Sequence, residues 1–122
     1  MPKILIIDDS EEIRDSLRTF LVTQGYEVVE AVDGQEGLEK SLHTHGIDVI
    51  ITDHNMPHMT GLEMLKVLRS DRRYKNTPIL FHTNESRPDF RATAQELGVR
   101  GWLVKPIAPQ VLKQLLDRLV HQ

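Results

Sequence analysis

The sequence contains no cysteine among its 122 residues. A disulfide scaffold, a zinc site built on thiolates, a cysteine nucleophile and an iron–sulfur cluster are therefore excluded. Aromatic residues are scarce, at 5% of the chain, with a single tryptophan. The remaining balance of 39% hydrophobic and 27% charged residues is that of an ordinary globular domain. A chain of this length buries roughly two thirds of its unfolded surface, so it needs no metal or disulfide to fold.

Long apolar runs and an excess of positive charge are missing as well. The aliphatic run that starts at Ile4 is only four residues long and leads directly into two aspartates, unlike a signal peptide. No segment approaches the ~20 apolar residues of a membrane span. Fifteen basic and eighteen acidic residues give a net charge of −3, opposite to the usual balance of a duplex-binding domain. We therefore expect a cytoplasmic protein that does not insert into membranes and does not bind nucleic acid.

Short aliphatic runs alternate with longer segments of helical periodicity. Apolar residues that recur every three to four positions predict five helices, most clearly in the last segment, from Leu112 to Leu119. Aliphatic strands without a polar face are typical of a parallel sheet covered by helices on both faces, joined by right-handed crossovers. The sequence thus predicts an α/β fold of five strand–helix units, with strands at Lys3–Ile7, Tyr26–Ala31, Asp48–Thr52, Pro78–Phe81 and Trp102–Val104.

Polar side chains follow four of the predicted strands: Asp8 and Asp9 the first, Asp53 the third, Thr83 the fourth and Lys105 the fifth. Because the carboxyl ends of parallel strands share one edge of a sheet, we expect these side chains to converge. Three neighbouring carboxylates repel one another, and oxygen ligands without cysteine or paired histidine favour Mg²⁺ as the ion that offsets this repulsion. A hydroxyl and an ammonium can hold phosphoryl oxygens, which leaves one carboxylate to attack phosphorus. Asp53, alone after its strand, is the candidate nucleophile.

Each of these residues also has an ordinary structural interpretation. A lone aspartate after a strand is most often a turn or helix-capping residue. Asp9 can cap the first helix, with Glu12 completing a capping box, and Asp33-Gly34 predicts a turn. A lone lysine is usually a solvated surface charge. The combination of four strand ends on one edge favours a shared site.

Together, these motifs resemble the receiver domain of two-component response regulators. Thirty residues separate Asp53 from Thr83 and twenty-two separate Thr83 from Lys105, spacings that are similar to those of the family. The resemblance covers residues 1–122, which we expect to form one receiver domain without an output domain. It implies a flavodoxin-like fold with strand order 2-1-3-4-5, of which this family is a known example. The matching segments are Ile6-Ile7-Asp8-Asp9-Ser10, Asp53-His54-Asn55-Met56-Pro57 with Gly61, Thr83, and Trp102-Leu103-Val104-Lys105-Pro106.

The resemblance also implies a role for each residue of the acidic edge. Asp53 would accept phosphate from a phosphohistidine on a sensor histidine kinase or a histidine phosphotransfer protein. Asp9 and Asp53 would bind Mg²⁺ directly, and Asp8 would act largely through water. The backbone carbonyl of Asn55 would be the remaining protein ligand. The chain would catalyse its own phosphotransfer and a slow autodephosphorylation without being an enzyme in the usual sense.

The remaining roles concern the switch. Lys105 would pair with the phosphoryl oxygens, and Pro106 would follow it through a cis peptide bond. Thr83 would move to hydrogen-bond the phosphate. Trp102 occupies the aromatic switch position, where the family often has the smaller Tyr or Phe. The surface of the fourth helix, fifth strand and fifth helix would then change and bind a downstream protein.

A narrower likeness connects the chain to stand-alone chemotaxis regulators of the CheY-like type. It rests on Asn55-Met56-Pro57, on Thr83-Asn84-Glu85-Ser86 and on Gly101–Pro106. It implies a switch in chemotaxis or motility, with a flagellar motor switch among the candidate targets. We expect a monomer, with dimerisation on activation left open. A phosphorelay shuttle or another stand-alone receiver remains the alternative.

Other classes of function fit the residues less well. A phosphatase of the haloacid dehalogenase type uses a second aspartate two residues after its nucleophile, and here Asn55, which cannot titrate, stands there. A phosphorylation-independent scaffold would not need a complete site. The basic residues around the end of the third helix favour a solvated helix end over a duplex-binding surface. They are Lys66, Arg69, Arg72, Arg73 and Lys75.

The histidines give a further set of expectations. The spacing of His54, His58 and His82 matches no standard zinc pattern. His54 and His58 follow the third strand, and we expect both to be partly solvated. Whether His82 or His54 makes activation depend on pH between 6 and 8 is left open.

Overall fold

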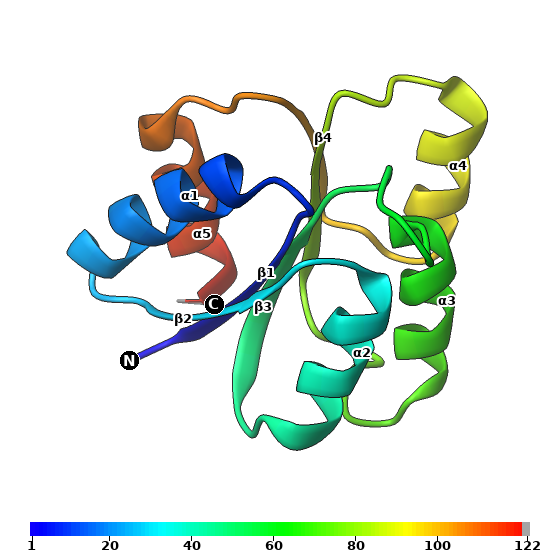
Figure 1. The fold of residues 1–122 in the computed structure, drawn as a ribbon, viewed down its shortest axis with the longest axis horizontal. Helices are drawn as coiled ribbons and strands as arrows, with labels where there is room; N and C mark the ends of the chain where they lie inside the picture. The colour runs from blue at the N-terminus through cyan, green and yellow to red at the C-terminus, as the bar shows by residue number, and fades with distance from the viewer. Residues whose placement is uncertain (121–122) are drawn as a thin grey trace.

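Strands and helices alternate along the whole of residues 1–120, the part of the chain that the computed structural model describes (Figure 1). The five strands are β1 (Lys3–Ile7), β2 (Glu27–Ala31), β3 (Ile47–Thr52), β4 (Ile79–Thr83) and β5 (Gly101–Val104). The five helices are α1 (Glu11–Thr23), α2 (Gly34–His43), α3 (Gly61–Ser70), α4 (Pro88–Glu96) and α5 (Pro109–Val120).

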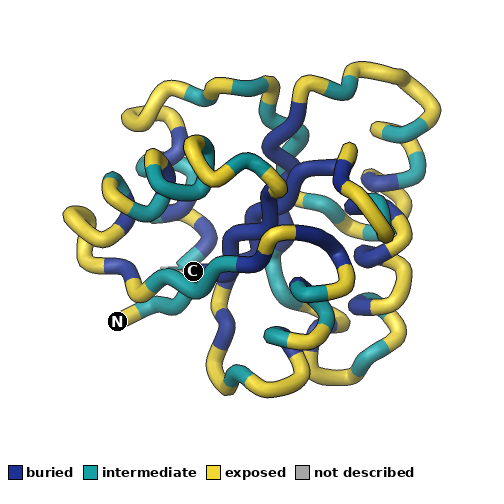
Figure 2. Tube along the Cα trace, in the orientation of Figure 1, coloured by how far each residue is buried: buried dark blue, intermediate teal, exposed yellow. Residues whose placement is uncertain are grey.

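The strands form a single sheet in the order β2-β1-β3-β4-β5, and every neighbouring pair is parallel. The predicted fold class and strand order are therefore confirmed. The three central strands are almost entirely buried, as Figure 2 shows, whereas the edge strands β2 and β5 carry exposed positions. A parallel sheet has this burial because helices cover both of its faces.

Successive strand residues point to opposite faces and build two separate cores. On one face, Leu5, Ile50 and Phe81 pack with residues of α2, α3 and α4. On the other face, Ile6 and Leu80 pack with residues of α1 and α5. Figure 1 shows the same division, with α1 and α5 together on one side of the sheet and α2, α3 and α4 on the other. Complete burial of one such side chain contributes roughly 1.5–3 kcal/mol, so these two cores hold the sheet rigid beneath its carboxyl edge.

At two helix starts the structure differs from what the sequence suggested: the alternative in which Asp9 caps the first helix, and the turn expected at Asp33-Gly34. Ser10, and not Asp9, caps α1, because its hydroxyl accepts a hydrogen bond from the Ile13 amide. Asp9 is thus left outside the helix, with its side chain available to the acidic edge. Asp33-Gly34 is not a separate turn: the Asp33 carboxylate accepts from the Glu36 amide and caps α2. Aspartate is favoured both in turns and at helix caps, so the dipeptide alone could not decide between them.

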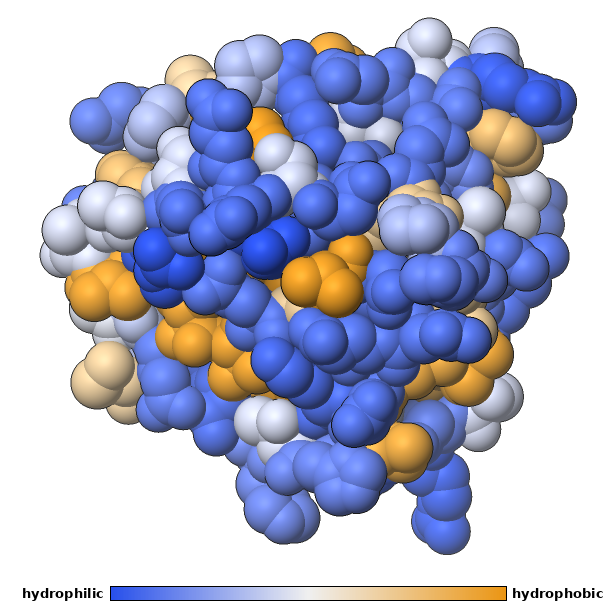
Figure 3. Space-filling model, in the orientation of Figure 1, coloured by the Kyte–Doolittle hydropathy of each residue, from blue (hydrophilic) through white to orange (hydrophobic). Residues whose placement is uncertain are grey.

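The surface on view in Figure 3 is predominantly hydrophilic, and its apolar residues form small separate patches. Scattered apolar residues of this kind are ordinary on the surface of a globular domain. Among residues 1–120, none of the helices combines the length and the apolarity that crossing a bilayer requires.

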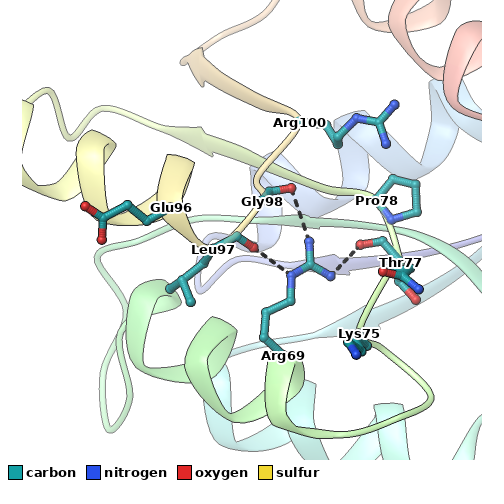
Figure 4. A pocket seen from close by; sticks show the side chains of 9 residues that line it. Arg69, Lys75, Thr77, Pro78, Glu96, Leu97, Gly98 and Arg100 are labelled. Atoms are coloured by element: carbon teal, nitrogen blue, oxygen red, sulfur yellow. Dashed lines mark hydrogen bonds between the residues drawn. The ribbon is translucent and has the colours of Figure 1, made fainter.

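The basic cluster at the end of α3 has a structural role through Arg69. Its guanidinium lies beside a hollow of about 420 Å³ at the amino ends of β4 and β5 (Figure 4). It donates to the carbonyls of Leu97 and Gly98 at the end of α4, at 2.8 and 3.3 Å, and to those of Tyr74 and Thr77 in the loop before β4, both at 2.8 Å. Carbonyls at a helix end have no partner within the helix, so this side chain supplies one.

Arg73 is likewise engaged, since it pairs with Asp71 at 2.9 Å and donates to the Leu42 carbonyl at 3.2 Å. Arg69 and Arg73 thus contact groups of the protein itself, and the half-buried Arg69 makes this helix end less solvated than expected.

Replacing Arg69 with methionine should lower the free energy of unfolding by about 2 kcal/mol. The variant keeps much of the apolar stem but leaves carbonyl groups of α4 and the α3–β4 loop without their donor, and hydrogen bonds to a charged group each contribute about 1.5–3 kcal/mol. Urea unfolding measures the change. Arg72→Met, an exposed arginine of the same cluster, is the matched control and should change stability by less than about 0.5 kcal/mol. Equal effects of the two substitutions would contradict the capping role of Arg69.

Candidate functional site

The ends of β1, β3 and β5 bring two carboxylates and one ammonium into direct contact. Lys105 Nζ lies 2.6 Å from Asp53 Oδ2 and 2.8 Å from Asp8 Oδ2. The three side chains are only 11%, 8% and 3% exposed, in the order Lys105, Asp53, Asp8. The pairing is therefore removed from bulk water, where a surface ion pair would contribute little. Three segments far apart in the sequence form one charged site, as predicted from the strand ends.

Burial and pairing act in opposite directions on the charges of this site. Burial raises the pKa of Asp8, and the hydrogen bond from Lys105 offsets part of that rise. Burial by itself lowers the pKa of Lys105, but its hydrogen bonds with Asp53 and Asp8, together with the charges of these carboxylates, raise it by more, so the net pKa lies above the ordinary value. Lys105 therefore stays protonated at neutral pH and is available as a fixed positive charge.

The acidic group extends to Asp9, whose side chain is exposed. Oxygen atoms of Asp8, Asp9 and Asp53 all lie within 4.8 Å of one another. One ammonium cannot neutralise three carboxylates at this spacing, and carboxylate oxygens are the ligands that a hard divalent cation prefers. The donor set therefore fits Mg²⁺, and no other group of three such residues occurs in residues 1–120.

The Asp53 side chain is fixed by the backbone around it. Its Oδ1 accepts a hydrogen bond from the His54 amide at 2.6 Å, and its own amide donates to the Ile7 carbonyl at 3.0 Å. Gly61 closes the loop by donating to the His54 carbonyl at 2.9 Å. A Cβ at Gly61 would lie 2.3 Å from the Asp53 carbonyl oxygen, so only glycine allows this approach. The sequence predicted Gly61 as part of the family motif, but it did not predict the close contact that requires a glycine there.

Asp8 is held in a similar way, partly by a residue that sequence reasoning missed. Its Oδ1 accepts from the Ser10 amide at 2.9 Å. Arg14, one turn into α1, donates from Nη1 to the Asp8 carbonyl at 2.6 Å and also pairs with Glu30 at 3.4 Å. Nothing in the sequence distinguishes an arginine that turns back toward a strand end from one on the exposed face of an amphipathic helix.

The two predicted switch residues are joined through the backbone of Glu85. The Thr83 hydroxyl, fully buried, accepts from the Glu85 amide at 3.1 Å. The half-buried Trp102 donates from Nε1 to the Glu85 carbonyl at 2.9 Å, and its ring stacks on Phe81 with centroids 4.9 Å apart. Sequence reasoning could not find this link, because a backbone group of any residue would provide it. A displacement of the Thr83 hydroxyl therefore acts on the residue whose carbonyl accepts from the indole.

Two further predicted site residues lie beside these groups. Asn55, in the exposed loop after β3, donates from its side chain to Glu85 Oε1 at 3.4 Å, which connects the β3–α3 and β4–α4 loops. The Lys105–Pro106 peptide bond is cis. The Lys105 amide donates to the Thr83 carbonyl at 3.1 Å and so ties the lysine to the end of β4.

The expectation that His54 is partly solvated was wrong. The residue is 4% exposed, because the β3–α3 loop folds back against α4. Its ring lies 4.6 Å from that of Phe90, its Nδ1 accepts from the Leu62 amide at 3.4 Å, and burial lowers its pKa. His58 is exposed as expected, with Nδ1 3.0 Å from Asp33 Oδ2.

His82 is buried on β4, and its Nε2 accepts a hydrogen bond from the Ile107 amide at 3.2 Å. Burial, together with the charge of Lys105, lowers the pKa of His82 to about 4. The ring therefore stays neutral between pH 6 and 8, which argues against His82 as a pH switch in that range.

Comparison with known proteins agrees with this geometry. The family model of the response regulator receiver domain matches residues 4–117. The chain is 43% identical over 116 residues to chemotaxis protein CheY1 of Helicobacter pylori, covering 94% of each chain. It is 39% identical over 121 residues to chemotaxis protein CheY of Pseudomonas aeruginosa, covering 98% of this chain and 97% of that one. Among solved structures, CheY4 of Vibrio cholerae has a TM-score of 0.90 at 44% identity, with 98% of each chain covered.

A five-stranded parallel sheet with three aspartates and a lysine at its carboxyl edge defines a receiver-type signalling domain, and the chain belongs to the response regulator receiver domain family. Within that family it is a CheY-like receiver, similar along nearly its whole length to chemotaxis proteins of that type. The resemblance stated from the sequence motifs is thereby confirmed.

The burial of His82 predicts a specific loss of stability in acid. Its pKa is about 4 in the folded protein against an ordinary value of 6.5, so the unfolded chain binds more protons between these pH values. The stability that His82 contributes is thus complete above pH 6.5 and decreases as the pH falls toward 4. Between pH 7 and pH 5, the wild type should lose about 1–2 kcal/mol more than His82→Leu does. Urea unfolding at the two pH values measures this difference, and equal losses would show that the ring is solvated.

Proposed function

We propose that this chain is a cytoplasmic chemotaxis switch, activated by phosphorylation of Asp53. The phosphate donor would be a phosphohistidine on a sensor histidine kinase or a phosphotransfer protein. The observation that carries the proposal is the Lys105 ammonium held between Asp53 and Asp8, beside the exposed carboxylate of Asp9. The chemotaxis assignment is supported by CheY relatives that the chain matches along 94–97% of their length.

The Asp53 carboxylate is the nucleophile in this proposal. One of its oxygens bonds to phosphorus, the phosphorus–nitrogen bond of the donor breaks, and the electron pair returns to the donor imidazole. Lys105 already lies 2.6 Å from Asp53, so a short movement transfers its hydrogen bond to a phosphoryl oxygen and neutralises charge there.

Four groups would hold Mg²⁺: the carboxylates of Asp9 and Asp53, Asp8 through water, and the backbone carbonyl of Asn55. Bound there, the ion would neutralise charge on the acidic residues and on the incoming phosphoryl group. The clustering of the three carboxylates within 4.8 Å supports this set.

Phosphorylation adds about −1.5 to −2 charge and new acceptor oxygens beside β4. We infer that the Thr83 hydroxyl then moves to donate to a phosphoryl oxygen and no longer accepts from the Glu85 amide. Because the carbonyl of the same residue, Glu85, accepts from the Trp102 indole, the indole and the adjoining surface of α4, β5 and α5 would change together. A downstream protein, with the flagellar motor switch as candidate, would bind the changed surface. The phosphate shifts the equilibrium only through its different affinity for the two arrangements.

The alternative functions differ in whether the site is phosphorylated and in what then happens to the phosphate. A phosphorelay shuttle would use the same site and pass the phosphate on to another histidine. A multiple-turnover phosphatase needs an acid or base at Asn55, whose amide cannot titrate, so the acyl phosphate should hydrolyse slowly. A phosphorylation-independent scaffold would not require Lys105 to be buried against two carboxylates.

The fluorescence of Trp102, the single tryptophan, should change in a saturable way when beryllofluoride and Mg²⁺ are added. Beryllofluoride stands in for the phosphoryl group on Asp53, and the indole is coupled to that site through Glu85 and stacked on Phe81. A fluorimetric titration measures the change, and a chelator should reverse it.

Asp53→Asn is the control for this titration and should show no response. A wild-type signal that is insensitive to the chelator, or that persists in Asp53→Asn, would exclude Asp53 as the site. If the fluorescence does not change, intact mass after treatment with acetyl phosphate decides whether the site is inactive.

Thr83→Ala should still accept phosphate, but its Trp102 signal should fall to a small fraction of the wild-type amplitude. The substitution removes the hydroxyl that holds the Glu85 amide and would bind the phosphoryl group, while it leaves Asp53, Lys105 and the Thr83 carbonyl in place. Intact mass and fluorescence on the same sample separate the two effects. A full fluorescence change in this variant would mean that the coupling runs by another route.

A further inference from the structure

His82 is a buried polar side chain for which the proposed mechanism has no use. It lies between Phe81 and Thr83 on β4, is 4% exposed, and points to the face that is otherwise lined by the aliphatic core under α1 and α5. A backbone amide can only donate, so the hydrogen bond from Ile107 N requires an unprotonated Nε2. The ring proton is then on Nδ1, which is buried and has no partner within residues 1–120.

An unpaired buried donor is unfavourable, and an aliphatic side chain at this position would avoid it. The imidazole provides in return an acceptor for the Ile107 amide. An aliphatic residue would leave that amide without its partner. The unsatisfied Nδ1–H of His82 on β4 therefore accompanies a hydrogen bond that fixes the Ile107 amide in the loop after β5.

That loop carries Lys105. Two hydrogen bonds hold it to β4, one on each side of Pro106, which has no amide hydrogen of its own. The Lys105 amide donates to the Thr83 carbonyl at 3.1 Å, and the Ile107 amide donates to His82 Nε2 at 3.2 Å. Adjacent residues of one rigid strand therefore fix both ends of residues 105–107.

We propose that His82 is a positioning residue for Lys105: through the Ile107 amide, its imidazole holds residues 105–107 so that Lys105 Nζ remains aimed at Asp53 and Asp8. The inference rests on the proposed function, because it assigns the origin of the geometry that phosphotransfer uses. The Lys105 side chain has four rotatable methylene groups, so its ammonium is placed accurately only if its backbone is fixed. Supporting residues of this kind typically change activity by about 10- to 100-fold when they are removed.

The test compares His82→Leu, which removes the acceptor, with His82→Gln, which retains a carbonyl acceptor on a side chain of similar length. The rate of phosphorylation by acetyl phosphate with Mg²⁺ is followed by intact mass. His82→Leu should react about 10-fold more slowly than the wild type, and His82→Gln should recover most of the loss. Hydrogen exchange of the Ile107 amide should become faster in His82→Leu and remain slow in His82→Gln.

The same substitution in a Lys105→Ala background separates positioning from a general structural effect. If His82 acts through Lys105, His82→Leu causes no further loss of rate once the lysine is absent. An equal loss in both backgrounds, or a wild-type rate in His82→Leu with Ile107 exchanging rapidly, would overturn the inference. His82→Met replaces His82→Leu if the latter does not fold.

Failure of the proposed function gives a different result. In that case the wild type itself gains no phosphoryl mass that depends on Asp53, with Asp53→Asn as the reference. A wild type that is phosphorylated on Asp53 with no difference between the His82 variants would reject the positioning role alone.

Discussion

The contact of one ammonium with two carboxylates is the constraint around which the rest of this structure is arranged. Lys105 Nζ joins β5 to β3 through Asp53 and to β1 through Asp8. Carboxylates at this spacing, removed from water, would otherwise repel one another and open the edge of the sheet. The pairing leaves the site with more negative than positive charge, since Asp9 adds a third carboxylate. The site is thus stable as it stands and still able to accept a cation and a phosphoryl group.

The parallel sheet explains why so few residues suffice. Each strand rises through a buried core and ends at the same edge, so side chains from separate parts of the chain meet without a dedicated loop scaffold. The two cores on either side of the sheet hold the strand ends rigid, while the connection after β4 lies mostly at the surface. Rigid strands position the reacting groups, and the exposed loop after β4 is free to rearrange when a phosphoryl group arrives.

Periodicity and strand-end chemistry were enough to predict the five strand–helix units and the convergence of Asp8, Asp53 and Lys105, because both depend on patterns that repeat along the chain. The predictions that failed concerned local details for which two neighbouring groups are almost equally suitable. A hydroxyl at Ser10 competed with the carboxylate of Asp9 for the same helix cap. The burial of His54 depends on the path of a loop against α4, which no pattern in the sequence reports. The contacts made by the Glu85 backbone could not be predicted from the sequence, since any residue at that position offers the same amide and carbonyl groups.

At the end of β4, separate contacts allow the reactive lysine, Lys105, to stay fixed while the switch residues move. Thr83 takes part in both, but through different atoms: its carbonyl accepts from the Lys105 amide, and its hydroxyl accepts from the Glu85 amide. Rotation about the Thr83 side chain can therefore release Glu85, and with it the indole of Trp102, without disturbing the hydrogen bond that anchors the lysine. A second anchor at His82 holds the same loop from the neighbouring residue. Phosphotransfer needs the lysine to stay in place while signalling needs the adjoining surface to move, and one strand end serves both because its backbone and side-chain groups have separate partners.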